Sequence, residues 1–356
     1  MKSLDVLSQV ILKHNYMHPA RMKTLRGMII GMMKTGKSLQ KSMAEGVAGD
    51  ATMESKTHKV QDFLREQLLC SFAMGKIILD FLKYKGKFRI VIDRTNWEFG
   101  KTDINYFVAS IVIGNTAIPI CWILLDSKGI SSTEQRIQLM EMVFQIIDPK
   151  QIECLLGDRE FVGEEWFDWL DTKGIPFVIR VRENFLLLDE ETNTEVQISS
   201  FFKKLKKEKT KHTIVNLWGK NRTIAVKRLK KDDELLILIS NYDFVEEQMF
   251  DLYRKRWGIE TIFKSLKTKG FNIEGTHMIN HERLSKLFFI ATLAAIISIK
   301  SGLIRHLKKP IPIKKHGRRL FSLFTYGYDF IRFYVFTNTS EFLDRFLQKV
   351  FALNVF

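Results

Sequence analysis

The stretch Phe88-Arg-Ile-Val-Ile-Asp93 decides the fold, because it is short, apolar and rich in β-branched residues, and it ends on an acid. Two further strand-like segments follow at 105–113 and 117–125, separated by the turn-like Gly114-Asn115-Thr116. Together the three segments predict an antiparallel meander, in which each strand pairs with the next one along the chain.

A second apolar segment, Ile152-Glu-Cys-Leu-Leu-Gly-Asp158, also ends on an acid. A helix is predicted between the meander and this segment, at 132–147, and a helix at 164–173 and a strand at 175–181 follow it. This order of elements predicts an α/β protein with a ribonuclease-H-like core. In that arrangement the strands that end at Asp93 and Asp158 are neighbours, so we expect the two carboxylates to converge.

A polar stripe is predicted on one later helix, at about 245–268. Tyr253, Arg256, Glu260 and Lys267 fall within a sector of about 60° on an ideal α-helix, with apolar residues on the opposite side. A carboxylate that shares its face with a phenol, a guanidinium and an ammonium suits an acid that holds a cation while its neighbours bind phosphates.

Asp93, Asp158 and Glu260 together form the donor set that Mg²⁺ prefers, since magnesium binds oxygen ligands. Two ions are expected, and Mn²⁺ can substitute for them. One ion would activate a water or a 3′-hydroxyl, and the other would stabilise the leaving oxygen. An Asp after a strand is often only a turn-former, and a Glu on a helix is often only solvent-exposed. The recurrence of Asp-Arg after two strands, together with the stripe, favours the catalytic interpretation.

Several motifs resemble those of DDE transposases of insertion-sequence family four. The stripe matches the family's Y-R-E-K signature, and Asp93-Arg-Thr-Asn-Trp97 and Gly157-Asp158-Arg-Glu-Phe161 look like its two Asp motifs. The segment His316–Gly327 is similar to the family's C-terminal segment, and Thr57–Leu64 shows a fainter likeness. The resemblance covers about residues 90–330.

The resemblance implies a ribonuclease-H-like core interrupted by a β-strand insertion, with Asp93, Asp158 and Glu260 as catalytic metal ligands. It also implies that Tyr253, Arg256 and Lys267 contact phosphates at the transposon end. We expect Arg256→Ala to weaken end binding or cleavage while fold and metal binding stay intact. Members of the family cut by hydrolytic nicking, and some proceed through a hairpin with a flipped base. Trp257 and Trp218 are candidates both for stacking on such a base and for the core, and Lys264 is a further phosphate candidate.

The domain organisation expected from these patterns has five parts. A helical DNA-binding domain spans 1–85, and the core spans 86–182 and 244–283. A basic β-rich insertion occupies 183–243, and a basic helical region occupies 284–356.

The charge of the chain favours a polyanionic partner. Lys and Arg number 56 against 40 Asp and Glu, a formal net charge of +16. Positive charge concentrates at 203–232, where only Glu208 and Asp232 are acidic, and again in the tail. Ribosomal, membrane-surface and merely basic proteins share this signature. The resemblance implies double-stranded DNA, both terminal inverted repeats and target, as the partner. A homodimer is expected because two transposon ends must be joined.

Other classes of site and location are not expected. The three cysteines show no paired spacing, which predicts buried free thiols, and His277 and His281 lack a third metal ligand. The longest apolar run, 287–299, is too short to span a bilayer, so no membrane partner is expected. The predicted location is the cytoplasm, on the bacterial nucleoid. The alternatives are a ribonuclease-H-like Mg²⁺-dependent nuclease without strand transfer, and a catalytically idle DNA-binding element product.

Overall fold

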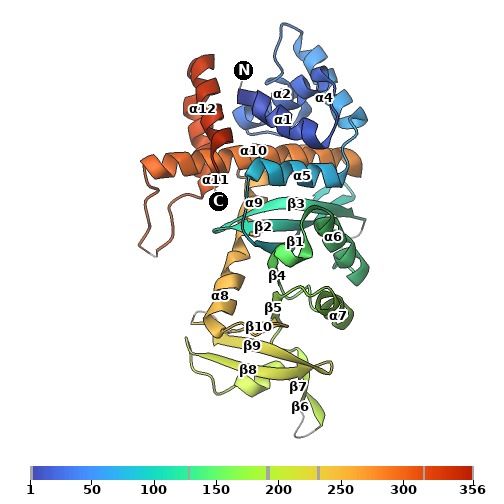
Figure 1. Cartoon of the computed structure of the whole chain (residues 1–356), viewed down its shortest axis with the longest axis vertical. Helices are drawn as coiled ribbons and strands as arrows, with labels where there is room; N and C mark the ends of the chain where they lie inside the picture. The colour runs from blue at the N-terminus through green and yellow to red at the C-terminus, as the bar shows by residue number, and fades with distance from the viewer. Residues whose placement is uncertain (1–2, 127–128, 190–192, 231–232, 316, 355–356) are drawn as a thin grey trace.

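The computed structural model describes residues 3–126, 129–189, 193–230, 233–315 and 317–354. Its strands are β1 (Phe88–Phe99), β2 (Thr102–Ile113), β3 (Thr116–Leu125), β4 (Ile152–Gly157), β5 (Phe177–Val181), β6 (Leu186–Asp189), β7 (Thr194–Gln197), β8 (Thr210–Leu217), β9 (Lys220–Arg228) and β10 (Leu235–Ser240). An eight-stranded sheet in the order β3-β2-β1-β4-β5-β10-β9-β8 forms the body of the molecule (Figure 1), and β6 pairs with β7 separately. The protein is thus a mixed α/β structure, which confirms the predicted class.

The antiparallel meander is present, since β1 pairs with β2 and β2 with β3. β1 also pairs in parallel with β4, which places Val91 opposite Leu156. Asp93 and Asp158 each follow this pair by two residues, Asp93 within β1 and Asp158 directly after β4. The prediction that Asp93 ends its strand is wrong, because β1 continues to Phe99. The strand continues because Thr95 and Trp97 keep the inward alternation and are buried against the rest of the sheet.

The helices next to these strands lie close to their predicted positions. They are α6 (Thr133–Ile146) and α7 (Glu164–Thr172). α6 begins with a capping box, in which the Ser132 hydroxyl accepts from the Gln135 N–H and the Gln135 side chain accepts from the Ser132 N–H. Short helical turns occur at Pro149–Gln151 (η1), Ile198–Phe202 (η2) and Ile273–Gly275 (η3), with a π-helical turn at Ile331–Val335 (η4).

The basic β-rich segment extends the main sheet. β10 returns to pair antiparallel with β5, which places Ile237 opposite Val181, and β9 and β8 follow outward from it. Alternate residues of β8 are exposed, as expected for an edge strand.

Helices from both ends of the chain form one layer at the other end of the sheet (Figure 1). They are α1 (Ser3–His14), α2 (Pro19–Thr35), α3 (Gln40–Ala44), α4 (Met53–Glu66), α5 (Ser71–Leu82), α10 (His281–Lys308), α11 (Leu323–Phe330) and α12 (Ser340–Ala352). α1 contacts α12, and α2 contacts α10. The helical character predicted for the first 80 residues and for the tail is confirmed.

α10 is the central helix of this layer. Its length and composition would allow it to cross a membrane, but 89% of its most apolar window is buried inside the protein. The interpretation of its apolar run as a buried core helix is therefore confirmed. Two lysines on α10 are also buried: Lys286 donates to the Leu64 carbonyl at 3.0 Å and Lys300 to the Phe81 carbonyl at 2.8 Å.

The helix predicted at 245–268 is two shorter helices, α8 (Glu246–Lys255) and α9 (Trp257–Leu266), which meet at Arg256. The Arg256 N–H donates to the Tyr253 carbonyl and the Ile259 N–H to the Arg256 carbonyl, so the junction is tightened to i→i+3 bonds. Lys267 lies just beyond α9 with φ −84° and ψ −134°, so it is not on the helix. Spacing in the sequence cannot reveal this local tightening.

The three cysteines differ in exposure. Cys121 and Cys154 are buried as predicted, but Cys70 is exposed at the start of α5, where its thiol accepts from the Ala73 N–H at 3.5 Å. Lys231, Asp232 and His316, which fall within the predicted basic segments, lie outside the described residues.

Candidate active site

A buried guanidinium joins two of the three predicted acids. Nη1 of Arg256 lies 3.2 Å from Oδ2 of Asp93, and Nη2 lies 2.8 Å from Oε1 of Glu260. The residues come from β1, from the junction of α8 and α9, and from the first turn of α9. Arg256 is only 7% exposed, so the bridge is shielded from water. The structure thus brings Asp93, Arg256 and Glu260 together.

Asp158 lies beside this bridge, directly after β4. Its Oδ1 accepts from the Glu160 N–H at 2.9 Å, and its carbonyl accepts from the Phe161 N–H at 3.1 Å. Asp158 therefore shapes a turn, as an Asp after a strand often does. Its charge also acts on Asp93 and Arg256, so it lies within electrostatic range of both.

The environment of Asp93 disfavours a bare negative charge. Burial raises the pKa of Asp93 to about 7, and the negative charges of Asp158 and Glu160 contribute in the same direction. Arg256 and the Arg94 N–H, which donates to Oδ1 of Asp93 at 2.8 Å, lower the pKa in opposition. The carboxylate is therefore held by one strong counter-charge, the Arg256 guanidinium.

Arg256 and Tyr253 are buried together. Burial alone lowers the pKa of Arg256, but Tyr253 and the carboxylates of Asp93, Glu260 and Asp158 together raise it above its usual value. The guanidinium carbon lies 5.6 Å from the centre of the Tyr253 ring. Within the described residues, Nε of Arg256 is buried without a hydrogen-bond partner. The bridge therefore leaves one donor unsatisfied.

Lys267, the last member of the predicted stripe, is held by protein groups. Its Nζ donates to the Asn96 carbonyl at 2.7 Å, forms an ion pair with Glu274 at 2.9 Å, and lies 5.4 Å from the centre of the Trp97 ring. These contacts tie the far half of β1 to η3. In this state the ammonium is a cross-link.

Sequence reasoning missed a pair of side chains that joins the two Asp motifs. Arg94 and Glu160 form a bidentate ion pair, with Nε–Oε1 and Nη2–Oε2 both at 2.7 Å. Arg136, which is buried on α6, donates to the Glu160 carbonyl at 2.8 Å and fixes the same turn. The repeated Asp-Arg was visible in the sequence, but its pairing with Glu160 depends on the packing of β1 against β4.

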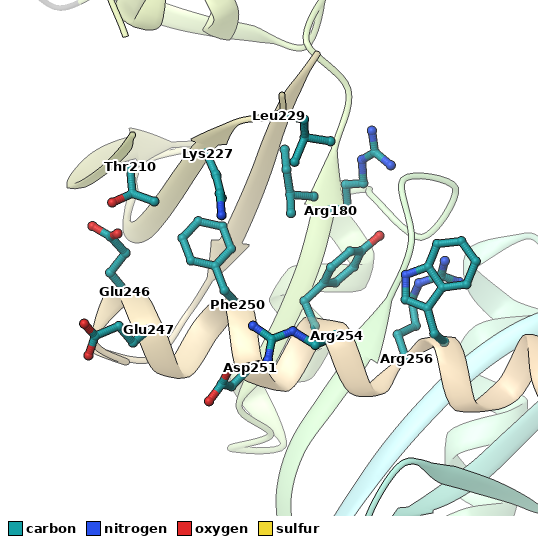
Figure 2. A pocket seen from close by; sticks show the side chains of 13 residues that line it. Arg180, Thr210, Lys227, Leu229, Glu246, Glu247, Phe250, Asp251, Arg254 and Arg256 are labelled. Atoms are coloured by element: carbon teal, nitrogen blue, oxygen red, sulfur yellow. Dashed lines mark ion pairs between the residues drawn. The ribbon is translucent and has the colours of Figure 1, made fainter. Parts of the chain in front are cut away.

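A pocket of about 540 Å³ opens next to Arg256, between α8 and the strands that follow β5. Figure 2 shows Phe250 of α8 and Lys227 of β9 on facing walls. Trp257 lines this pocket and is 57% exposed, whereas Trp218 packs edge-on against Phe167 and Phe185. Trp257 is thus the better placed of the two candidate stacking residues. Lys264 is exposed on α9.

The donor chemistry of the site fits a hard divalent cation. Among the described residues, no three Asp, Glu, His or Cys side chains are close enough to hold a metal ion together. Arg256 instead lies between Asp93 and Glu260 and supplies positive charge to the Asp93 carboxylate, which burial destabilises. A divalent ion would supply the same compensation through oxygen ligands.

Comparison with known proteins identifies a family. A family model described as the transposase DDE domain matches residues 85–297, more than half of the chain, and the matched range includes all three acids and Arg256. No curated protein matches the sequence. Membership of this family implies a metal-dependent enzyme that processes DNA. The chain belongs to the transposase DDE domain family.

Proposed function

We propose that this protein is a cut-and-paste DNA transposase, which binds terminal inverted repeats and catalyses Mg²⁺-dependent cleavage and strand transfer. One observation carries the proposal. Asp93 and Glu260 both contact the buried guanidinium of Arg256, although Asp93 is 163 residues from Arg256 in sequence. This contact lies beside Asp158 and inside the matched region.

The proposed domain organisation has a ribonuclease-H-like core at 86–182 and 244–283. The strand order β3-β2-β1-β4-β5, with α6 and α7 in the connections, supports this core. The interval 183–243 is proposed as its insertion, attached to the core sheet by the pairing of β10 with β5. The start of the family match just after α5 supports a boundary near residue 85 for a DNA-binding domain at 1–85. The helical region at 284–356 completes the proposal.

In this proposal Asp93, Asp158 and Glu260 hold two Mg²⁺ ions, for which Mn²⁺ can substitute. The bound ions would activate the attacking water or 3′-hydroxyl and stabilise the leaving oxygen. In their absence, Arg256 serves as the counter-charge of the acids.

Tyr253, Arg256 and Lys267 are proposed to contact phosphates of the transposon end. A guanidinium released from the carboxylates can bind phosphate with two parallel hydrogen bonds, and an ammonium acts as a point charge. Because Arg256 and Lys267 now bind protein acceptors, DNA binding has to exchange these contacts. Trp257, at the open pocket, is the proposed stacking residue.

The proposed partners are duplex DNA with terminal repeats, target DNA, and a second copy of the protein that brings the two ends together. The net charge of +16 supports binding to phosphates. The proposed place of action is the bacterial nucleoid in the cytoplasm.

Cleavage of duplexes that carry the element's terminal inverted repeats tests the proposal. The parent protein should cut them with Mg²⁺ and not with EDTA, and Asp93→Asn and Glu260→Gln should abolish cutting. Glu165→Gln, which alters an exposed carboxylate on α7, is the matched control and should cut normally. Undiminished cutting by either site variant would contradict the assignment.

Strand transfer needs its own measurement. A duplex with a free 3′-hydroxyl at the terminal repeat should be joined to a plasmid target. Cleavage without joining would instead indicate a nuclease, and binding with neither would indicate an idle element product.

A further inference from the structure

A basic arm connects α10 to α11 and projects from the body of the protein (Figure 1). We define the arm as residues 310–315 and 317–321. It is anchored at its base, where Ile311 is buried and its N–H donates to Nδ1 of His306 at 2.8 Å. The Tyr326 hydroxyl donates to the Lys309 carbonyl at 3.0 Å on the same side. The root of the arm is therefore fixed to the helical layer.

The arm is a two-stranded ribbon built from its own backbone. Ile313 bridges antiparallel to Arg319, the Lys314 N–H donates to the Arg318 carbonyl, and the Leu320 N–H donates to the Pro312 carbonyl, both at 2.8 Å. Gly317 adopts φ +79° at the turn, a conformation that favours glycine. Backbone hydrogen bonds within the arm thus hold its described residues in a ribbon.

The charge on the arm is of one sign. Lys314, Lys315, Arg318 and Arg319 are exposed, and Lys308 and Lys309 are exposed at its root. The sequence has no acidic residue between Glu282 and Asp329. The four lysines among these cations, Lys308, Lys309, Lys314 and Lys315, form no ion pair with a described residue.

The cations of the β-rich segment differ in this respect. Lys220 and Arg222 form ion pairs with Asp171, and Lys227 lies 3.9 Å from Glu208. Part of that positive charge is therefore compensated within the protein, although the segment is rich in cations. The arm is the less compensated of the two basic surfaces.

Apolar side chains on the arm also face solvent. Ile313 is 70% exposed, and Leu320 and Phe321 are each 41% exposed. Exposed apolar side chains grouped among polar ones are typical of a binding surface. A partner that offers both negative charge and apolar surface would match the arm.

We propose that the arm is a DNA-binding ribbon that enters a groove of duplex DNA, with its cations on the flanking phosphates. A two-stranded ribbon fits the major groove of B-DNA, where thymine methyl groups provide apolar contacts. Anions along both groove edges match the lysines and arginines on the two strands of the arm. The inference rests on the proposed function, since it names a new contact surface for the same substrate.

The test compares two triple variants of the full-length protein. Lys314→Ala, Lys315→Ala and Arg319→Ala remove three charges from the arm. The matched control removes three exposed lysines near the starts of β1 and β4, with Lys85→Ala, Lys87→Ala and Lys150→Ala. Binding to a short DNA duplex is measured in EDTA over a range of salt concentrations, and thermal denaturation confirms that both variants fold.

The arm variant should bind DNA more weakly. The slope of log K against log salt concentration should be shallower by about 2 to 3, since each lost phosphate contact reduces the slope by about 0.9. The control should keep the parent slope. Equal slopes for the two variants would overturn the proposal. If the arm variant keeps the parent slope on DNA but loses binding to vesicles of anionic lipid or to an acidic peptide, the proposal is overturned in favour of that partner.

Failure of the arm and failure of the proposed function are distinguishable. If the parent cuts terminal repeats and the arm variant keeps its salt slope, only the arm inference fails. If the arm variant loses slope but the parent never cuts, the arm stands as a DNA-binding element and the transposase proposal fails.

Discussion

Replacing Arg256 with methionine should make folding stability depend on pH and on Mg²⁺ in ways that the parent protein does not show. Methionine has an unbranched side chain of similar length but lacks the guanidinium that lies between Asp93 and Glu260. The motif alone led us to expect that loss of Arg256 leaves the fold intact. Its burial between two carboxylates leads to a different expectation.

The size of the effect follows from the burial of the partners. Removing one member of a buried ion pair costs about 3–5 kcal/mol. The Asp93 side chain is 16% exposed and that of Glu260 is 29% exposed, so water compensates part of the loss at Glu260. We expect a decrease of about 3 kcal/mol in the free energy of unfolding at pH 8.

The pH dependence has a defined sign. In the parent, the pKa of Asp93 is raised from 3.8 to about 7, so the native state binds more protons between these values and this group's contribution to stability falls as pH rises. Above pH 7 the contribution is constant. Without Arg256 the pKa moves higher, so stability continues to fall above pH 7, by about 1.4 kcal/mol per pH unit until the new pKa is reached.

Mg²⁺ should reverse much of this loss, because the ion can replace the missing positive charge. The midpoint of urea denaturation, followed with and without Mg²⁺ at pH 7 and 8, should shift further for Arg256→Met than for the parent. Arg222→Met is the control, since Arg222 is equally buried and pairs with Asp171 away from the site. It should lose stability without gaining a response to Mg²⁺. Equal Mg²⁺ responses in Arg256→Met and the parent would refute the view that Arg256 occupies the place of a cation.

Three further predictions concern other contacts. In a double-mutant cycle of Arg94→Ala and Glu160→Ala, monitored by chemical denaturation, the bidentate pair should show a coupling of about 1.5–3 kcal/mol; coupling near zero would argue against the clamp. Burial lowers the pKa of Lys300 from 10.5 to about 8, so the unfolded chain binds more protons between these values. The free energy of unfolding of the parent should therefore rise by up to about 3 kcal/mol relative to Lys300→Met as pH rises through this window. A difference that does not depend on pH would contradict this prediction. A Cβ at Gly327 would lie 1.9 Å from the Ser298 carbonyl oxygen, so Gly327→Ala should force α10 and α11 apart and lower the melting temperature by several degrees. Gly219→Ala serves as the comparison without a clash, because no atom lies within 4 Å of the added Cβ there, although φ is +72°.

The sequence predicted the core strands well, because they depend on local patterns. The apolar runs that end at Asp93 and Asp158 are short and bounded, and the parallel pairing of their strands follows from the order of elements. The extension of β1 past Asp93 was missed, because apolar and polar residues alternate there. This extension pairs with β2 over its full length.

The geometry around Glu260 was less predictable. Helical spacing correctly placed Arg256 next to Glu260, but it could not show that the helix breaks at Arg256 or that Lys267 leaves it. The ion pair of Arg94 with Glu160 joins two separate motifs, so no local pattern contains it. The functional roles of the predicted site residues remain predictions.

The packing of α1 against α12 has a consequence for synthesis of the protein. α1 ends at His14 and α12 begins at Ser340, so synthesis at ~10 residues per second separates them by on the order of half a minute. Throughout that time the surface of α1 that packs on α12 has no partner on the nascent chain. The helical layer can therefore close only after α12 has been synthesised.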